Sequence, residues 1–270
     1  MARTTCTRQQ RPPRPPGLAI GTLNIQDGWS FGLTQAIWAV ERRGFDVMLL
    51  TKTRIPATAY CRNLLGYEVT FFAAQPTSSG GSQGGVGVVT RERPFGRGIY
   101  STHYHRPNMA SCEIITGLTR TPLVGTYLPP STVEHLPELE EVLQLFRDPI
   151  FLRDLNMDLN KSRRPQSQQV ADLLTDYGII YLVRHFRQSY RFHNLKTWSQ
   201  FRQETVFRLI FDYIIGTDRR RLELLGICDM RNFSSDHFAL RPRLLRRPTC
   251  CHPRYLRGRK EFPLRLRPSE

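Results

Sequence analysis

The sequence lacks long hydrophobic runs: none reaches the roughly 20 apolar residues that a membrane-spanning helix needs. It also lacks a secretory leader, because the basic stretch RQQRPPRPPG is broken by prolines and contains no apolar core. These absences argue against a membrane or secreted protein. We expect an intracellular, reducing location, with the nucleus favoured over the cytoplasm.

Cysteine is sparse, and the glycine-rich stretch has no nucleotide-binding spacing. The six cysteines are too scattered for a disulfide scaffold. Cys250, Cys251 and His252 stand together, but no second ligand pair lies at zinc-finger spacing, so a zinc site is not expected. SSGGSQGG (78–85) lacks the GxGxxG pattern and precedes no helical pattern, and therefore predicts a flexible hairpin loop.

Acidic residues are scarce: 23 stand against 39 basic residues, which gives a net charge of +16. Residues 1–16 carry +4 and residues 241–270 carry +8, so the body between them is nearly neutral. Basic ends favour contact with nucleic acid or an anionic membrane, and solvated tails are the alternative. We expect a disordered leader at 1–16, one folded domain at 17–245 and a basic tail at 246–270.

The apolar pattern predicts more strands than helices. Helical spacing marks three segments, two of which end in glycine: 33–44, 135–146 and 166–178. Strand patterns mark nine segments: 17–25, 45–51, 67–74, 85–90, 110–118, 122–128, 149–156, 205–216 and 239–245. Several strands are consecutive, which favours two packed mixed sheets with helices on their outer faces over an alternating parallel sheet.

Polar side chains recur where the predicted strands end. They are Asn24, Lys52, Tyr127, Asp154, Asn156, Asp212, Asp236 and His237. Each has an ordinary structural interpretation by itself, as a strand end, a core residue or a turn cap. A polar group beside apolar sequence is nevertheless costly unless it has partners. Convergence on one pocket at a sheet edge explains the whole series.

The residue types in this series suit phosphodiester chemistry. Carboxylate and amide oxygens, as in the pair Asp154 and Asn156, favour Mg²⁺ or Mn²⁺ over zinc. A histidine beside a carboxylate, as in Asp236 and His237, suits a general acid or base. A metal, amides and an imidazole together are what in-line attack of water on a phosphodiester requires.

The order of these motifs resembles the endonuclease/exonuclease/phosphatase superfamily. The motifs are TLN, LLTKTRI, TYLPP, RDLNMDLN, KTW, FDYIIGTDRR and SSDHFAL. Within the superfamily they are most similar to the apurinic-like endonuclease domain of LINE-type (non-LTR) retrotransposons, over residues 18–245. The resemblance implies a DNase I-like four-layer α/β sandwich that nicks DNA with Mg²⁺ or Mn²⁺. DNA, or RNA of the parent element, is the implied partner.

The resemblance also implies roles for the catalytic residues. Asp154 would orient or deprotonate the attacking water, and Asn156 and Tyr127 would contact the scissile phosphate. His237 would contact the phosphoryl oxygen, and Asp212 would orient the His237 imidazole from behind.

Metal and nucleic-acid contacts are implied in the same way. Asn24 and Asp236 would help to hold the metal. Thr197 and Trp198 resemble the DNA-contacting stretch of the family. No reverse-transcriptase sequence follows in this chain, which indicates a fragment of an element or a gene derived from one.

Three positions depart from the family pattern. Lys52 stands where the family has the glutamate that binds the metal, and an ammonium offers a cation no lone pair. Gln26 replaces an acid, and Arg153 replaces a glycine and is a candidate for nucleic-acid contact. These changes predict impaired catalysis. A working nuclease, a non-catalytic nucleic-acid-binding remnant and a phosphatase of the same superfamily are the alternatives.

Lys52 is expected to point into the pocket. Strand alternation would place it on the face of Met48 and Leu50, just beyond them at the sheet edge. Its ammonium would then lie within hydrogen-bonding reach of Asp154 or Asp236.

Overall fold

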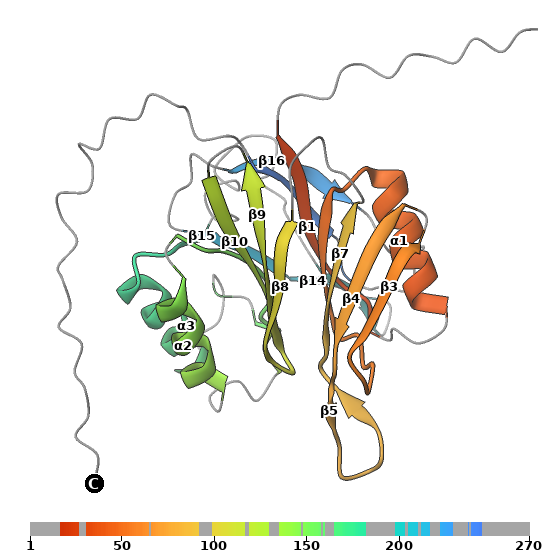
Figure 1. Ribbon diagram of the computed structural model, residues 1–270. Helices are drawn as coiled ribbons and strands as arrows, with labels where there is room; N and C mark the ends of the chain where they lie inside the picture. The colour runs from red at the N-terminus through yellow and green to blue at the C-terminus, as the bar shows by residue number, and fades with distance from the viewer. Residues whose placement is uncertain are drawn as a thin grey trace, which may run out of the picture.

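The computed structural model contains two large β-sheets packed face to face between helices (Figure 1). It describes residues 17–26, 31–64, 66–91, 99–116, 119–129, 135–146, 148–157, 159, 165–181, 198–202, 205–209, 212–216, 222–228, 237 and 239–244. Helix α1 covers the outer face of one sheet, and helices α2 and α3 cover the outer face of the other. The predicted four-layer α/β sandwich is confirmed. The proposed leader and the tail lie outside the described residues.

The first sheet has seven strands in the order β16-β17-β1-β2-β7-β4-β3. Their bounds are β16 Leu222–Cys228, β17 Ala239–Leu244, β1 Leu18–Asn24, β2 Val47–Thr51, β7 Val86–Arg91, β4 Tyr67–Phe72 and β3 Ala59–Leu64. Strands β1 and β2 are parallel, because helix α1 (Phe31–Arg43) carries the chain back between them. The other neighbours in this sheet are antiparallel.

The second sheet has six strands in the order β12-β15-β11-β10-β9-β8. Their bounds are β12 Ile180–Tyr181, β15 Asp212–Gly216, β11 Ile150–Asp154, β10 Thr119–Tyr127, β9 Met109–Thr116 and β8 Ile99–Arg106. Strands β10 and β11 are parallel and are joined through helix α2 (Leu136–Leu145), and helix α3 (Pro165–Asp176) follows β11. Two small hairpins complete the fold: β5 Gln75–Pro76 with β6 Ser82–Gln83, and β13 Trp198–Arg202 with β14 Thr205–Leu209.

The two parallel strand pairs set the position of the functional site. Asn24 is paired with Thr51 at the carboxyl ends of β1 and β2. Tyr127 is paired with Asp154 at the carboxyl ends of β10 and β11. Because the sheets are stacked, these two ends lie against each other, and polar residues meet there at the end of an apolar interior.

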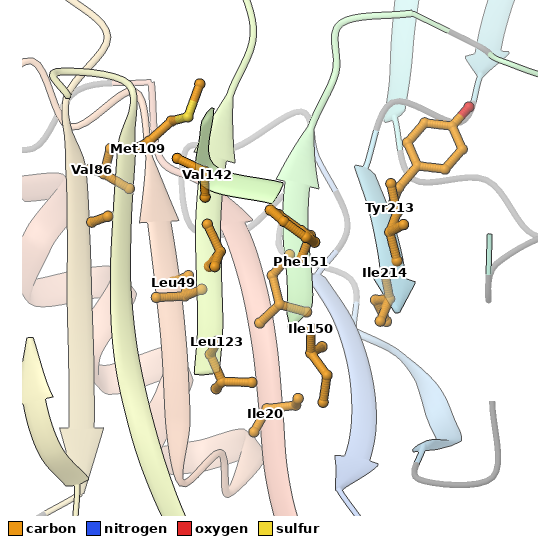
Figure 2. Close-up of a cluster of buried hydrophobic side chains, with 14 of the residues drawn as sticks. Ile20, Leu49, Val86, Met109, Leu123, Val142, Ile150, Phe151, Tyr213 and Ile214 are labelled. Carbon is orange, nitrogen blue, oxygen red and sulfur yellow. The ribbon is translucent and has the colours of Figure 1, made fainter. Parts of the chain in front are cut away.

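The interior between the sheets is apolar and closely packed. Ile20 and Leu49 of the first sheet belong to one cluster with Leu123 and Ile150 of the second, and all are almost completely buried (Figure 2). A Cβ atom on Gly125 would lie only 3.1 Å from Leu49 Cδ1. The missing side chain at Gly125 therefore lets β10 approach β2 closely, two residues before Tyr127.

Two helices end where the sequence predicts glycine stops. Gly44 follows α1 with φ +69, its N–H donates to Glu41 O at 3.0 Å, and the N–H of Phe45 donates to Val40 O at 3.0 Å. Gly178 follows α3 with φ +64 in the same arrangement. Both are helix-terminating motifs whose left-handed residue is most favourable when it has no Cβ.

The strands that the sequence does not predict are chiefly those at the sheet edges. Strands β16 and β3 bound the first sheet, and β12 and β8 bound the second. An edge strand is covered less than a central strand and needs no continuous apolar pattern, as IYSTHYHR of β8 illustrates. The predicted strand 205–216 is a second difference, because it forms β14 in a hairpin and β15 in the second sheet.

None of the helices among the described residues is long and apolar enough to cross a membrane.

Candidate functional site

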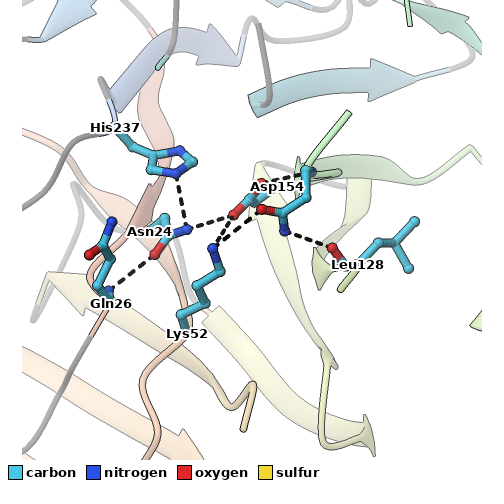
Figure 3. Close-up of polar contacts among 7 residues, drawn as sticks. Asn24, Gln26, Lys52, Leu128, Asp154 and His237 are labelled. Atoms are coloured by element: carbon cyan, nitrogen blue, oxygen red, sulfur yellow. Dashed lines mark hydrogen bonds and ion pairs between the residues drawn. The ribbon is translucent and has the colours of Figure 1, made fainter. Parts of the chain in front are cut away.

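A buried amide–carboxylate pair joins the two sheets. Asn24 is the last residue of β1 and Asp154 the last of β11, and both are fully buried. Asn24 Nδ2 donates to Asp154 Oδ2 at 2.6 Å (Figure 3). A hydrogen bond to a charged group is stronger than a neutral one, and burial leaves water little access to replace it. This contact holds the carboxyl ends of the two sheets in register.

His237 extends the pair, and its tautomer follows from the geometry. Asn24 Oδ1 accepts the N–H of Gln26 at 3.1 Å, which orients the amide with Nδ2 toward Asp154. Asn24 Nδ2 also lies 3.2 Å from Nε2 of His237, which is buried. An amide nitrogen only donates, so Nε2 must accept and the ring proton lies on Nδ1. His237 is therefore a neutral imidazole with its acceptor nitrogen in the site.

Asn156 anchors the other oxygen of Asp154. The N–H of Asn156 donates to Asp154 Oδ1 at 3.0 Å, and Asn156 Nδ2 donates to Leu128 O at 2.7 Å. The backbone at Asn156 is left-handed, with φ +49, a conformation that asparagine tolerates better than most residues. The turn places the Asn156 side chain above the end of β10, beside Tyr127.

Lys52 occupies the space beside this carboxylate. Its Nζ lies 3.7 Å from Asp154 Oδ2, and these two residues face each other in Figure 3. The ammonium donates to Asn156 Oδ1 at 3.3 Å. The ammonium also lies 5.0 Å from the centre of the Tyr127 ring. It therefore forms an ion pair with Asp154, one of the two predicted carboxylates, while its hydrogen bond goes to an amide oxygen.

The predicted route of Lys52 to this position is wrong. Met48 and Leu50 pack with helix α1, whereas Leu49 packs between the sheets. Strand β2 ends at Thr51, and the left-handed backbone of Lys52, with φ +54, breaks the alternation. The side chain thus points into the inter-sheet side, opposite to the face of Met48 and Leu50.

Tyr127 remains a protonated phenol at neutral pH. Burial first, and then the charge of Asp154, raise the pKa of Tyr127 to about 12, although a hydrogen bond with Asn156 and the charge of Arg54 oppose the shift. The hydroxyl group can therefore donate a proton to a hydrogen bond but does not supply a phenolate nucleophile.

A depression of about 380 Å³ opens beside these residues. It is lined by Gln26, Lys52, Arg54, Ser82, Gln83, Gly84 and Tyr127. The sequence analysis does not assign a binding role to Arg54, Ser82 or Gln83. The only available signals are the second cation in TKTR and the polar residues within the glycine-rich hairpin.

Left-handed backbone is concentrated at this site. Five non-glycine residues among those described have positive φ, and four of them are site residues: Gln26, Lys52, Arg54 and Asn156. Each comes within three residues after the end of β1, β2 or β11. This conformation costs about 1–2 kcal/mol per residue, and such strain is concentrated at functional sites in proteins.

Solved structures with the same fold include nucleases. An endonuclease domain of TRAS1, a telomere-specific non-LTR retrotransposon, matches with a TM-score of 0.61 at 15% identity, over 86% of this chain and 100% of that domain. An AP endonuclease from Archaeoglobus fulgidus matches with a TM-score of 0.59 at 15% identity, over 84% of this chain and 99% of that one. This chain has the endonuclease/exonuclease/phosphatase fold.

A member of the endonuclease/exonuclease/phosphatase family from Leptotrichia buccalis has the same fold. Its TM-score is 0.56 at 15% identity, over 84% of this chain and 99% of that one. No protein-family model and no curated protein sequence matches this chain. The similarity of this chain to these proteins is therefore a similarity of fold.

The described side chains do not fit a divalent cation. Asp154 is the single carboxylate in the described site. Asn24 turns its amide nitrogen, rather than its amide oxygen, toward Asp154. The Lys52 ammonium repels a second cation from the same carboxylate. Within the described parts of the chain, no group of three His, Cys, Asp or Glu residues could hold a metal ion.

The remaining predicted residues are placed only in part. The backbone of Asp212 is paired with Asp154 across β15 and β11. Arg153 lies in β11 and Trp198 begins β13, and the side chains of these three residues lie outside the description. Asp236 and Thr197 fall outside the described residues. The catalytic, metal and nucleic-acid roles given to all these positions stay predictions.

Proposed function

We propose that this chain is a retrotransposon-derived endonuclease-like domain whose ancestral metal-dependent nicking of DNA is impaired by Lys52. The fold supports the ancestry, since the TRAS1 domain with the same fold is an endonuclease domain of a non-LTR retrotransposon. The juxtaposition of Asn24, Asp154 and His237 supports it as well, because it unites three motifs of the nuclease-like series.

One observation carries the impairment: Lys52 Nζ lies 3.7 Å from Asp154 Oδ2. Two unit charges at this separation interact by about 4 kcal/mol at an effective dielectric constant of 20. A glutamate at residue 52 would attract a divalent cation at a similar distance by about twice that term, because the ion carries two charges, and the ammonium repels it by a similar amount. Exchange of Glu for Lys thus disfavours the cation twice, once by losing a ligand and once by adding a charge.

The other residues of the site are suited to phosphate contact. Tyr127 keeps its hydroxyl proton at neutral pH and can donate it to a phosphate oxygen. His237 keeps Nε2 as an acceptor toward Asn24, and Asp154 is held by Asn24 and Asn156. These side chains are poised to position a water or a phosphate, but the cation that would offset the charge of the reacting phosphate is disfavoured.

Nicking of supercoiled plasmid DNA in Mg²⁺ tests the proposal. Wild type should produce little nicked circle, and Lys52→Glu should produce clearly more. Lys52→Gln is the matched control, because it removes the ammonium without supplying a carboxylate, and it should recover less activity than Lys52→Glu. Asp154→Ala added to Lys52→Glu should abolish the recovered activity.

Two results would contradict the impairment. Robust Mg²⁺-dependent nicking by the wild type, lost in Asp154→Ala, would show that the enzyme works with lysine at residue 52. Equal, low activity of wild type and Lys52→Glu, with both proteins folded by circular dichroism, would show that Lys52 is not what limits catalysis.

A second candidate function is nucleic-acid binding without catalysis. The net charge of +16 supports it, because phosphate contacts by lysine and arginine dominate non-specific affinity. Removal of residues 247–270 should then weaken DNA binding and make it less dependent on salt. An unchanged affinity and salt dependence would leave the basic tail as a solvated segment. A DNA-binding role suits a nuclear location.

A further inference from the structure

The depression beside Asp154 has a wall of positive charge. Lys52 and Arg54 both line it, and none of its seven lining residues is acidic. Asp154, the carboxylate that forms an ion pair with Lys52, does not line the depression and is completely buried. Arg54 is exposed and two residues further from the strand end. The charge that faces solvent here is therefore cationic.

The rest of the wall offers hydrogen-bond donors. Gln26 and Gln83 carry side-chain amides, and Ser82 carries a hydroxyl. Tyr127 adds a phenol that stays protonated, because its pKa is raised to about 12. Donors beside two cations are the lining that an oxyanion requires, and they are poorly suited to an apolar ligand.

The backbone around the depression is held in place on both sides. The N–H of Thr53 donates to Gly85 O at 3.2 Å, and the N–H of Arg54 donates to Gly84 O at 3.0 Å. Gly84 has φ +74, and a Cβ on it would overlap the side chain of Asn108. The segment after β2 and the segment before β7 are thereby fixed together, so the cations and the donors lie on one shaped surface.

We propose that this depression binds a phosphate group of a nucleic-acid strand without a metal ion, with Arg54 and Lys52 supplying the positive charge. The inference deepens the proposed function and rests on it for the nucleic acid, since the lysine that disfavours the cation becomes a direct phosphate ligand. Arginine matches phosphate oxygens with its planar fork, and lysine serves as a point charge. The volume of about 380 Å³ lies at the lower end of the usual range for small-ligand sites.

The test is fluorescence anisotropy in EDTA with a labelled eight-nucleotide single strand. One probe carries a 5′-phosphate and the other a 5′-hydroxyl, which distinguishes a terminal phosphate from an internal one. Arg54→Gln should weaken binding of at least one probe roughly tenfold, as expected for loss of a hydrogen bond to a charged group. The slope of log K against log salt concentration should decrease in magnitude by about 0.7 for one lost phosphate contact.

Arg120→Gln is the matched control for the loss of one positive charge. Arg120 is 58% exposed, and it lies in β10 seven residues before Tyr127, or about 23 Å along the strand. A second pair adds a charge instead: Gln83→Glu in the wall should weaken binding, whereas Ser78→Glu, exposed at the turn of the same hairpin, should change it much less.

The outcomes separate this inference from the proposed function. If Arg54→Gln and Gln83→Glu bind both probes as tightly as their controls do, the phosphate site is refuted, whatever Lys52→Glu does in the nicking assay. If instead the wild type nicks DNA robustly, the impairment is refuted, while the metal-free binding series still decides the site. Weakening of the 5′-phosphate probe alone identifies a terminal phosphate, and equal weakening identifies a backbone phosphate.

Discussion

Two regions of the site differ in burial and in charge. The inter-sheet junction, formed by Asn24, Asp154 and His237, is at most 2% exposed and is linked by short hydrogen bonds. The cationic rim, formed by Lys52 and Arg54, is partly exposed and has left-handed backbone. The junction belongs to the packing of the two sheets, so a change there disturbs the fold. The rim lies beyond the strands, so a change there alters mainly what the site can bind.

This difference explains why residues of the rim can be exchanged more easily than residues of the junction while the fold persists. Replacing a residue of the junction would leave buried polar groups without partners. Placing a lysine on the rim costs less, because Lys52 keeps 19% of its side chain exposed and finds Asp154 and Asn156 as partners. The fold therefore tolerates a cationic side chain at this position of the rim.

The largest effect is expected from breaking the junction. Asp154→Ala would leave Asn24 Nδ2, the N–H of Asn156 and the ammonium of Lys52 without their carboxylate, and should lower the free energy of unfolding by about 3–5 kcal/mol. Urea denaturation measures it. Glu141→Ala is the control: it breaks an exposed ion pair with Arg106 and should cost about 0–1 kcal/mol. Equal costs would show that Asp154 contributes no more to stability than one partner of an exposed ion pair.

A smaller effect is expected from forcing the sheets apart below the junction. Gly125→Val places methyl groups against Leu49, whose Cδ1 would be 3.1 Å from the new Cβ, and should cost about 1–3 kcal/mol by overpacking. Leu49→Ala in the same protein should recover part of this loss. A double-mutant cycle in urea measures the coupling, and strictly additive costs would show that β2 and β10 do not meet at this point.

The rim should respond less than the junction. Lys52→Gln leaves Asp154 with its hydrogen bonds from Asn24 and Asn156 and should lower the free energy of unfolding by about 1 kcal/mol or less. The measurement is again urea denaturation, beside Asp154→Ala. A loss as large as that of Asp154→Ala would mean that Lys52 is a structural part of the junction rather than of the rim.

The smallest effect concerns Tyr127, which stands between the two regions. Its folded pKa of about 12 is above the ordinary value of 10.0, so the folded state holds this proton more tightly than the unfolded state. The resulting stability is fully present below pH 10 and is lost as the pH rises toward 12. The free energy of unfolding of the wild type minus that of Tyr127→Phe should be smaller at pH 11 than at pH 9. An equal difference at the two pH values would indicate a water-exposed phenol.

The helices and the central strands could be predicted because their patterns are local. Helical spacing with glycine stops marks α1 and α3, short apolar runs mark central strands such as β2, and the structure agrees within a few residues. The edge strands could not be predicted in this way. Strands β3, β8 and β16 each pair with a single neighbour, β4, β9 and β17, and an edge strand is covered less than a central one, so its sequence needs no continuous apolar pattern.

The candidate site could be predicted as a set but not as a geometry. The motif order singles out Asn24, Asp154 and His237. Asn24 contacts Asp154, which lies 130 residues further along the chain, and His237, which lies 213 residues further along. Arg54 lies within the motif LLTKTRI but has no role assigned to it from the sequence, and Gln83 belongs to no motif. Only the folded hairpin brings Gln83 beside the end of β2. A binding surface made of such ordinary residues is visible only when the chain is folded.

By itself, the sequence determined the fold class, the carboxyl-end position of the polar residues and the positive charge at residue 52, because these depend on apolar period, strand ends and residue type. Only the tertiary structure decided which way Lys52 points and what it touches. The physical reason is the backbone: a left-handed φ of +54 reverses the face that alternation predicts, and the stacking of two sheets then supplies Asp154 as its partner.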